Sequence, residues 1–135
     1  MVKQYLYITD SLASNTSGRV TFSENKITVN MFGLAYDSVK VLSAGIRNDI
    51  QLDYPTLRLE SGPGYTTDLL PAVACLLNDL SQPSTGFFIS KTTDPGVTFN
   101  NLNNKQNIVF CLVDNDTIAV DIADVDDLYI LLEIE

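Results

Sequence analysis

Carboxylates are the most numerous groups in this sequence that could take part in chemistry, and histidine is absent. The 135 residues include 17 Asp and Glu, 8 Lys and Arg, and no His. Without His there can be no Ser-His-Asp triad, no Cys-His nucleophile and no imidazole base near neutral pH. His-ligated zinc and iron sites are excluded as well. Carboxylate, lysine, tyrosine and magnesium chemistry remain open, but we expect a protein that is not an enzyme and has no catalytic residue, cofactor or metal site.

The acidic residues are concentrated late in the chain. Residues 1–113 contain nine acids and eight bases, whereas residues 114–135 contain eight acids and no base. The favoured interpretation is a solvated acidic edge that aids solubility. The alternatives are a surface complementary to a basic partner, or a weak cation site. The candidate partner-interface residues in this stretch are Asp121, Asp124, Asp126 and Asp127.

Two further observations limit the ligands. The loop 114–116 has the sequence Asp-Asn-Asp but lacks the glycine and the distal glutamate of an EF-hand, so the calcium signal is weak. The formal net charge of −9 would repel phosphates, so we expect no direct binding to nucleic acid. Cys75 and Cys111 each lie in an apolar run, which favours two buried thiols, although a disulfide is possible if the two segments touch.

Alternation of apolar and polar residues predicts strands along most of the chain. Residues 20–31 predict a hairpin with a Glu24-Asn25 turn. Residues 108–113 are apolar on both faces, which is typical of a central strand. Residues 128–134 alternate strictly, with Leu128, Ile130, Leu132 and Ile134 on one face. Further strands are expected at 39–45, 57–60, 86–90, 97–99 and 118–122.

One segment departs from this pattern. Between Thr67 and Leu80, apolar residues occur at 69, 70, 73, 76, 77 and 80, which is the stripe of an amphipathic helix. Thr67 or Asp68 could cap its start, and Pro71 falls in the first turn, where proline is tolerated. We therefore predict one short α-helix at about 67–80.

These elements predict a single domain over residues 1–135, because the length suits one domain and no repeat or linker divides the chain. The fold class expected is all-β: an antiparallel β-sandwich of the jelly-roll type with one short α-helix. No apolar run approaches the roughly 20 residues of a membrane span, so we expect no transmembrane segment. The first residues lack the pattern of a signal peptide.

The order of the elements carries a resemblance. A strand-like opening at 5–11 precedes the hairpin; the segment 36–48 follows, and residues 56–60 lead to a Gly-Tyr-Thr element in 64–73. This order resembles the single-jelly-roll minor capsid and penton proteins of icosahedral DNA viruses, in the lineage with double-jelly-roll major capsid proteins. In the loop after Ile46, Arg-Asn-Asp stands in place of a Pro-Asn turn, which departs from the pattern.

The resemblance implies a structural role without catalytic residues. It implies a minor capsid or vertex (penton) subunit that assembles as a pentamer or trimer and docks on other capsid proteins. Its location would be the virion, after synthesis in the host cytoplasm without a signal peptide. Tyrosines could supply interface area, although the favoured interpretation places most of them half-buried at the ends of the sandwich.

Two other classes remain as alternatives. The first is a carbohydrate- or ligand-binding β-sandwich, such as a spike, adhesin or lectin-like module. Its candidate residues combine aromatic and amide side chains: Tyr54, Tyr65, Asn100, Asn101 and Asn103. The second is an acid-catalysed hydrolase, which needs two converging carboxylates at a defined separation.

Overall fold

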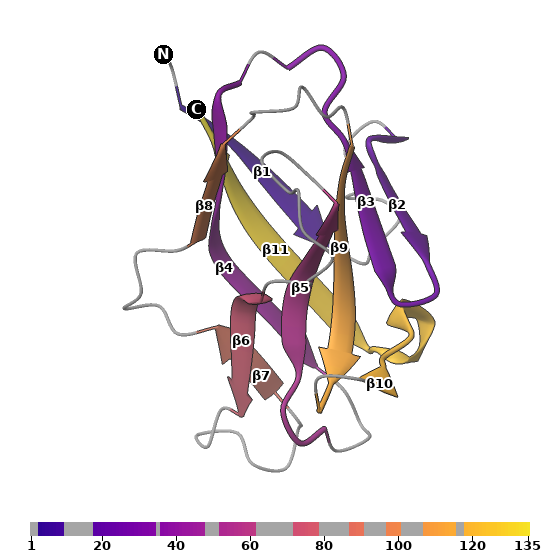
Figure 1. Cartoon of the computed structure of the whole chain (residues 1–135). Coiled ribbons are helices and arrows are strands. Elements are labelled where there is room, and N and C mark those ends of the chain that lie inside the picture. The colour runs from indigo at the N-terminus through magenta and orange to yellow at the C-terminus, as the bar shows by residue number, and fades with distance from the viewer. Residues whose placement is uncertain are drawn as a thin grey trace.

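Strands make up nearly all of the described structure (Figure 1). The computed structural model describes residues 3–9, 18–34, 36–47, 52–61, 72–78, 87–90, 97–100, 107–115 and 118–135. The strands are β1 (Gln4–Thr9), β2 (Val20–Ser23), β3 (Lys26–Asn30), β4 (Ser38–Arg47), β5 (Thr56–Ser61), β6 (Ala72–Asn78), β7 (Phe87–Ser90), β8 (Val97–Asn100), β9 (Asn107–Asp114), β10 (Ile118–Ala119) and β11 (Asp127–Ile134). Within these ranges the only helix is η3, a 3-10 helix at Ile122–Asp124, and no helix is long and apolar enough to cross a membrane.

The strands form two antiparallel sheets that pack face to face (Figure 1). The first sheet has the order β1-β11-β4, and β8 and β7 pair with successive parts of β4. The second has the order β2-β3-β9-β5-β6, and β10 pairs with the end of β9. Because β6 also pairs with β7, the two sheets are joined along one side. The strand order ends at β1 and β2, which are the edge strands of the opposite, open side.

The pairing confirms the predicted jelly-roll sandwich. Segments from the two halves of the chain pair antiparallel in nested order: β1 with β11, β3 with β9, β4 with β7 and β8, and β5 with β6. The chain is therefore folded as one long hairpin that is wound into two layers. The resulting orders, β1-β11-β4-β7 and β3-β9-β5-β6, are those of a jelly roll.

The predicted α-helix at about 67–80 is wrong where the structure describes this segment. Ala72–Asn78 is strand β6, which lies between β5 and β7 and pairs with both. Residues 67–71 and 79–80 lie outside the described residues. A short run that is apolar at consecutive positions suits a strand buried on both faces as well as a helix, and periodicity alone does not separate the two. Strand partners on both edges satisfy the backbone of β6 and decide the outcome.

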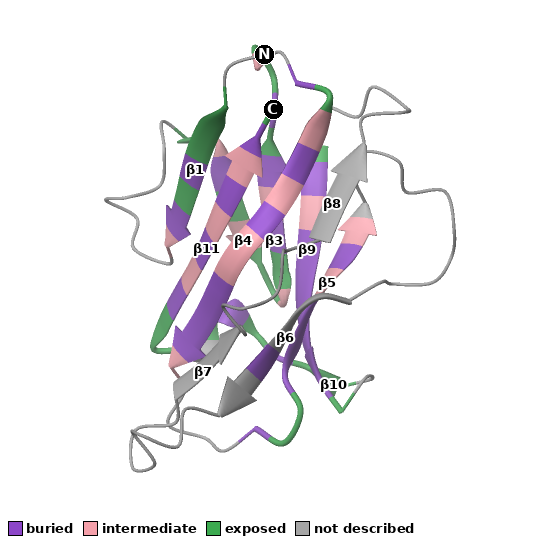
Figure 2. Cartoon of the chain, turned by 90° about the vertical axis from the view of Figure 1, so that its left-hand side faces the viewer, coloured by how far each residue is buried: buried purple, intermediate pink, exposed green. Residues whose placement is uncertain are grey.

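The hydrophobic core lies between the sheets and follows the predicted alternation. Along β11, Leu128, Ile130, Leu132 and Ile134 are buried while the residues between them are partly exposed (Figure 2). Ile108, Phe110 and Leu112 of β9 face them from the second sheet and are fully buried. Each such side chain stabilises the fold by about 1.5–3 kcal/mol. Glu24 and Asn115, which belong to the two predicted turns, have the positive φ values of 55° and 52° that tight turns use, and Asp116 of the second turn lies outside the described residues.

The outer face of strand β9 is partly buried, because Cys111 and Val113 are buried while Val109 is intermediate. Cys111 is a buried, free thiol, so it forms no disulfide with Cys75. Lys26 and Glu60, from the strands on either side of β9, form a 2.9 Å ion pair that crosses β9 near Cys111. Burial, followed by the nearby charge of Glu60, raises the pKa of the Cys111 thiol. Cys111 is thus a packing residue that is protected from reaction.

A buried carboxylate fixes the loop before β5. Asp114, at the end of β9, accepts hydrogen bonds from the backbone N–H groups of Asp53, at 3.1 and 3.2 Å, and of Tyr54, at 2.7 Å. The side chain of Asn115 donates to the carboxylate of Asp53 at 3.1 Å. Asp114 therefore joins two segments that meet at one end of the sandwich.

Replacing Asp114 with Ala should lower the free energy of unfolding by about 1–3 kcal/mol, because two part-buried backbone donors lose their partner. Urea unfolding followed by circular dichroism measures the change. The matched control is Asp53→Ala, which keeps the backbone donor and loses only an exposed bond to Asn115. Equal losses in the two variants would contradict the anchoring role of Asp114.

Candidate functional site

The four acidic residues predicted as a partner interface lie on the segment that leads from β10 into β11. Asp121 precedes η3 and caps it, since its Oδ1 accepts from the backbone N–H of Ala123 at 3.0 Å. Asp124 ends η3, and its side chain lies outside what the structure describes. Asp126 donates its backbone N–H to the Arg47 carbonyl at 2.9 Å, and the Asp127 carboxylate lies 2.7 Å from Arg47 Nε. The four acids therefore lie along the single segment 121–127, and Arg47 binds the end of this segment through Asp126 and Asp127.

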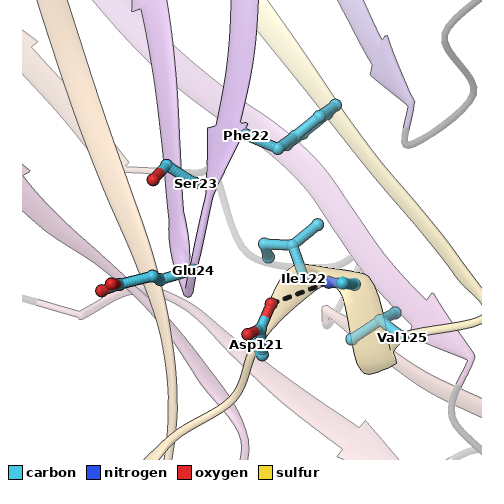
Figure 3. Close-up of a pocket in the computed structure, with 7 residues that line it drawn as sticks. Phe22, Ser23, Glu24, Asp121, Ile122 and Val125 are labelled. Atoms are coloured by element: carbon cyan, nitrogen blue, oxygen red, sulfur yellow. Dashed lines mark hydrogen bonds between the residues drawn. The ribbon is translucent and has the colours of Figure 1, made fainter.

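Asp121 lies at a pocket of about 300 Å³ between the β2–β3 turn and η3 (Figure 3). The lining combines apolar and acidic side chains: Phe22, Ser23, Glu24, Asp121, Ile122, Ala123 and Val125. Ile122 and Val125 belong to the core, and Phe22 is packed against it. The backbone N–H of Ile122 donates to the Glu24 carbonyl at 2.8 Å, which ties the two walls together. The pocket therefore has an apolar floor with the Asp121 carboxylate at its rim, while the Glu24 side chain extends away from Ile122 and Asp121 (Figure 3).

A second surface is a row of tyrosines on the outer face of the first sheet, here called the tyrosine face: Tyr5, Tyr7 and Tyr129. Tyr5 and Tyr7 lie on edge strand β1 and are 60% and 54% exposed. Leu6 and Ile8 between and beyond them face the core, so alternation turns the tyrosines outward. The rings of Tyr7 and Tyr129 are stacked, with centroids 6.4 Å apart.

Gly45 makes room for Tyr129. The ring of Tyr129, on β11, lies over Gly45 of the neighbouring strand β4, in the space that a Cβ would occupy. Gly45 does not have a left-handed φ, so space and not backbone conformation requires glycine there. Burial, then the neighbouring Tyr7, raises the pKa of Tyr129, and a hydrogen bond with Ser43 opposes the shift. The ring is therefore held against the sheet.

The outcome for the tyrosines differs from the favoured interpretation. Tyr5, Tyr7 and Tyr54 are exposed, Tyr54 by 73%, whereas Tyr36 is buried and Tyr129 is intermediate. Half-burial was therefore the wrong expectation for four of the five tyrosines that the structure describes, and it holds for Tyr129. Alternation in β1 gave the signal for Tyr5 and Tyr7, but it could not show that β1 is an edge strand.

The candidate sugar-binding residues are only partly described. Tyr54 lies on the loop that Asp114 anchors, beside the hydrogen-bonded pair of Asp53 and Asn115. Asn100 ends β8, and its side chain lies outside the described structure. Tyr65, Asn101 and Asn103 lie outside the described residues altogether. Among the residues whose side chains are described, no three potential metal ligands gather in one place.

No model of a known protein family matches this chain, and a comparison with curated proteins finds no similar sequence. The fold and its surfaces therefore carry the functional argument. Three features stand out on the described surface: the acidic pocket, the tyrosine face and the anchored loop of Tyr54. None of them brings together a nucleophile and a base from the described residues.

Replacing Gly45 with Ala should displace the Tyr129 ring and lower the free energy of unfolding by about 1–3 kcal/mol, as overpacking does. Chemical denaturation measures the loss. In a Tyr129→Ala background the same change should cost clearly less, because the clash is gone. An equal cost in both backgrounds would show that Gly45 is needed for a reason other than the ring.

Proposed function

We propose that this protein is a structural subunit that assembles with copies of itself and with neighbouring proteins, as minor capsid and vertex (penton) subunits do. The observation that carries the proposal is the exposed pair Tyr5 and Tyr7 on edge strand β1. Natural proteins usually blunt an edge strand with charges, proline or a covering loop. Tyrosine is instead enriched where proteins bind one another. Strand β1 thus has the composition of a contact surface.

The charge distribution supports association through this surface. The described residues around β1, 3–9, contain one base and no acid. That base, Lys3, lies 3.5 Å from the Glu133 carboxylate on β11, so the pair is neutral. Asp126 and Asp127 lie at the other end of β11. Two copies could approach through the tyrosine face with little of the repulsion that a net charge of −9 would otherwise cause.

The capsid role is supported by the strand order and by the resemblance of the element order. Jelly-roll sandwiches form capsid domains and also lectins, so the architecture alone suits both roles. The absence of histidine agrees with a protein that works by contact. On this proposal the subunit forms a closed ring or trimer in the virion and docks there on other capsid proteins.

Light scattering after size-exclusion chromatography, together with mass photometry, tests the self-association. The natural protein should form a closed oligomer, and the double variant Tyr5→Ser/Tyr7→Ser should be monomeric, because the apolar contact area is lost. The control is Tyr54→Ser, which changes a tyrosine that is even more exposed and lies on another surface, and it should leave the oligomer intact. A natural protein that stays monomeric at high concentration would sink the proposal.

A second candidate function is sugar binding at the loop of Tyr54. This loop holds an exposed ring next to a carboxylate and an amide, Asp53 and Asn115, and Asp114 fixes its backbone. An aromatic ring can cover the apolar face of a sugar while the polar groups bind its hydroxyls. Rigid presentation reduces the entropy lost on binding.

Sugar binding at this loop predicts a positive signal on a glycan array that Tyr54→Ala abolishes and Tyr5→Ala leaves unchanged. Isothermal titration with the best glycan then gives the affinity of each variant. Retention of the signal in Tyr54→Ala would place the sugar elsewhere on the protein. A blank array, combined with a closed oligomer in light scattering, would leave assembly as the only proposed function.

A further inference from the structure

We infer that the pocket between the β2–β3 turn and η3 is a docking site for a lysine or arginine side chain from a basic segment of a partner protein. The site is separate from the tyrosine face and does not require self-association. The inference rests on the proposed function in one respect: it takes the ligand to be part of a protein.

The shape of the pocket suits one long side chain. Its volume of about 300 Å³ is at the small end of the range for ligand sites, roughly 300–1,000 Å³. Figure 3 shows Ile122 between Phe22 on β2 and Asp121 at the start of η3. Phe22, Ile122 and Val125 give the floor an apolar character that a bound metal ion would not use. A methylene chain would fill such a floor.

The negative charge at the rim of the pocket favours a side chain that ends in a cationic group. Glu24 and Asp121 are exposed, and neither carboxylate forms an ion pair with a base in the described part of the chain. The Asp121 carboxylate lies beside Ile122, whereas the Glu24 side chain extends away from it (Figure 3). Two nearby bases form their ion pairs elsewhere: Lys26 with Glu60, and Arg47 with Asp127. The pKa of Lys26 is raised mainly by Glu60 and to a smaller extent by the charge of Glu24. The bond to Ala123 uses only Oδ1 of Asp121. Lysine and arginine combine an apolar stem with a cationic head, which matches both parts of the pocket.

The walls are held in place before any ligand arrives. Besides the bond from Ile122 to Glu24, the backbone N–H of Val125 donates to the Ile122 carbonyl at 3.2 Å. On the other side of the turn, the N–H of Leu112 donates to the Asn25 carbonyl at 2.9 Å. A site that is already ordered loses little conformational entropy on binding. The remaining acids of residues 114–135 would attract a basic segment from a distance.

The test is an amide-resonance NMR titration of the full ¹⁵N-labelled protein. The probe is a capped Leu-Lys-Leu peptide, and the control probe replaces its lysine with norleucine, which keeps the stem and lacks the ammonium. The lysine peptide should shift the signals of residues 22–25 and 121–125, and added salt should weaken its binding. The norleucine peptide should bind clearly more weakly. Equal binding of the two probes, or no shift at these residues, would overturn the inference.

Charge variants locate the contact. Asp121→Asn keeps the cap of η3, because asparagine caps a helix as well as aspartate does. This change should weaken the lysine peptide by about two- to fivefold, as expected for an exposed ion pair. The effect of Glu24→Gln should be smaller, because the Glu24 side chain extends away from Ile122 and Asp121 (Figure 3). The matched control is Asp37→Asn, which removes the same charge beside Glu135, at the far end of β11. An equal effect of Asp37→Asn would show a general effect of net charge and no docking site.

Two further measurements separate the possible failures. Dilution of the labelled protein without peptide should leave residues 22–25 and 121–125 unshifted; shifts there would mean that a second copy fills the pocket and would overturn a separate partner. The variant Tyr5→Ser/Tyr7→Ser should bind the lysine peptide normally. A natural protein that stays monomeric but binds the lysine peptide would count against the assembly proposal alone.

Discussion

The fold depends on antiparallel pairing between segments from opposite ends of the chain. Strand β11 lies between β1 and β4, so the last described strand completes the sheet that the first one begins. In the second sheet, β9 has the same role between β3 and β5. Buried backbone N–H and C=O groups need partners, and here only distant segments can supply them. Neither sheet can therefore form until the chain has closed on itself.

The surfaces available for function follow from this pairing. Winding a long hairpin into two layers closes one side through β6 and β7 and leaves β1 and β2 as edges on the other. The tyrosine face lies at one of these edges. The acidic pocket forms where the turn after β2 meets η3, just before the chain enters β11. Both surfaces are places that the hydrogen-bonded sheets leave uncovered.

The tyrosine face and the pocket differ in charge and polarity, which suits a protein that contacts more than one kind of neighbour. The tyrosine face is apolar and close to neutral, which favours contact between like-charged copies. The pocket is acidic at its rim and apolar beneath, which favours a basic partner. The loop of Tyr54 is held by the buried Asp114 and presents an aromatic ring to solvent. A jelly-roll sandwich can carry such surfaces without change to its core, because its buried positions are set by alternation along the strands.

The sequence by itself determined the strands and most of the inward-facing residues, because alternation is a local property: Leu128, Ile130, Leu132 and Ile134 were readable from residues 128–134 alone. The sequence also predicted the jelly-roll sandwich and named Asp121 as a candidate partner-interface residue. Only the tertiary structure decided that Ala72–Asn78 is a strand, since its partners β5 and β7 come from other parts of the chain. It also decided that Tyr5 lies on an edge strand and that Phe22 and Asp121 line one pocket. Both outcomes depend on pairing between segments far apart in sequence, which no local pattern records.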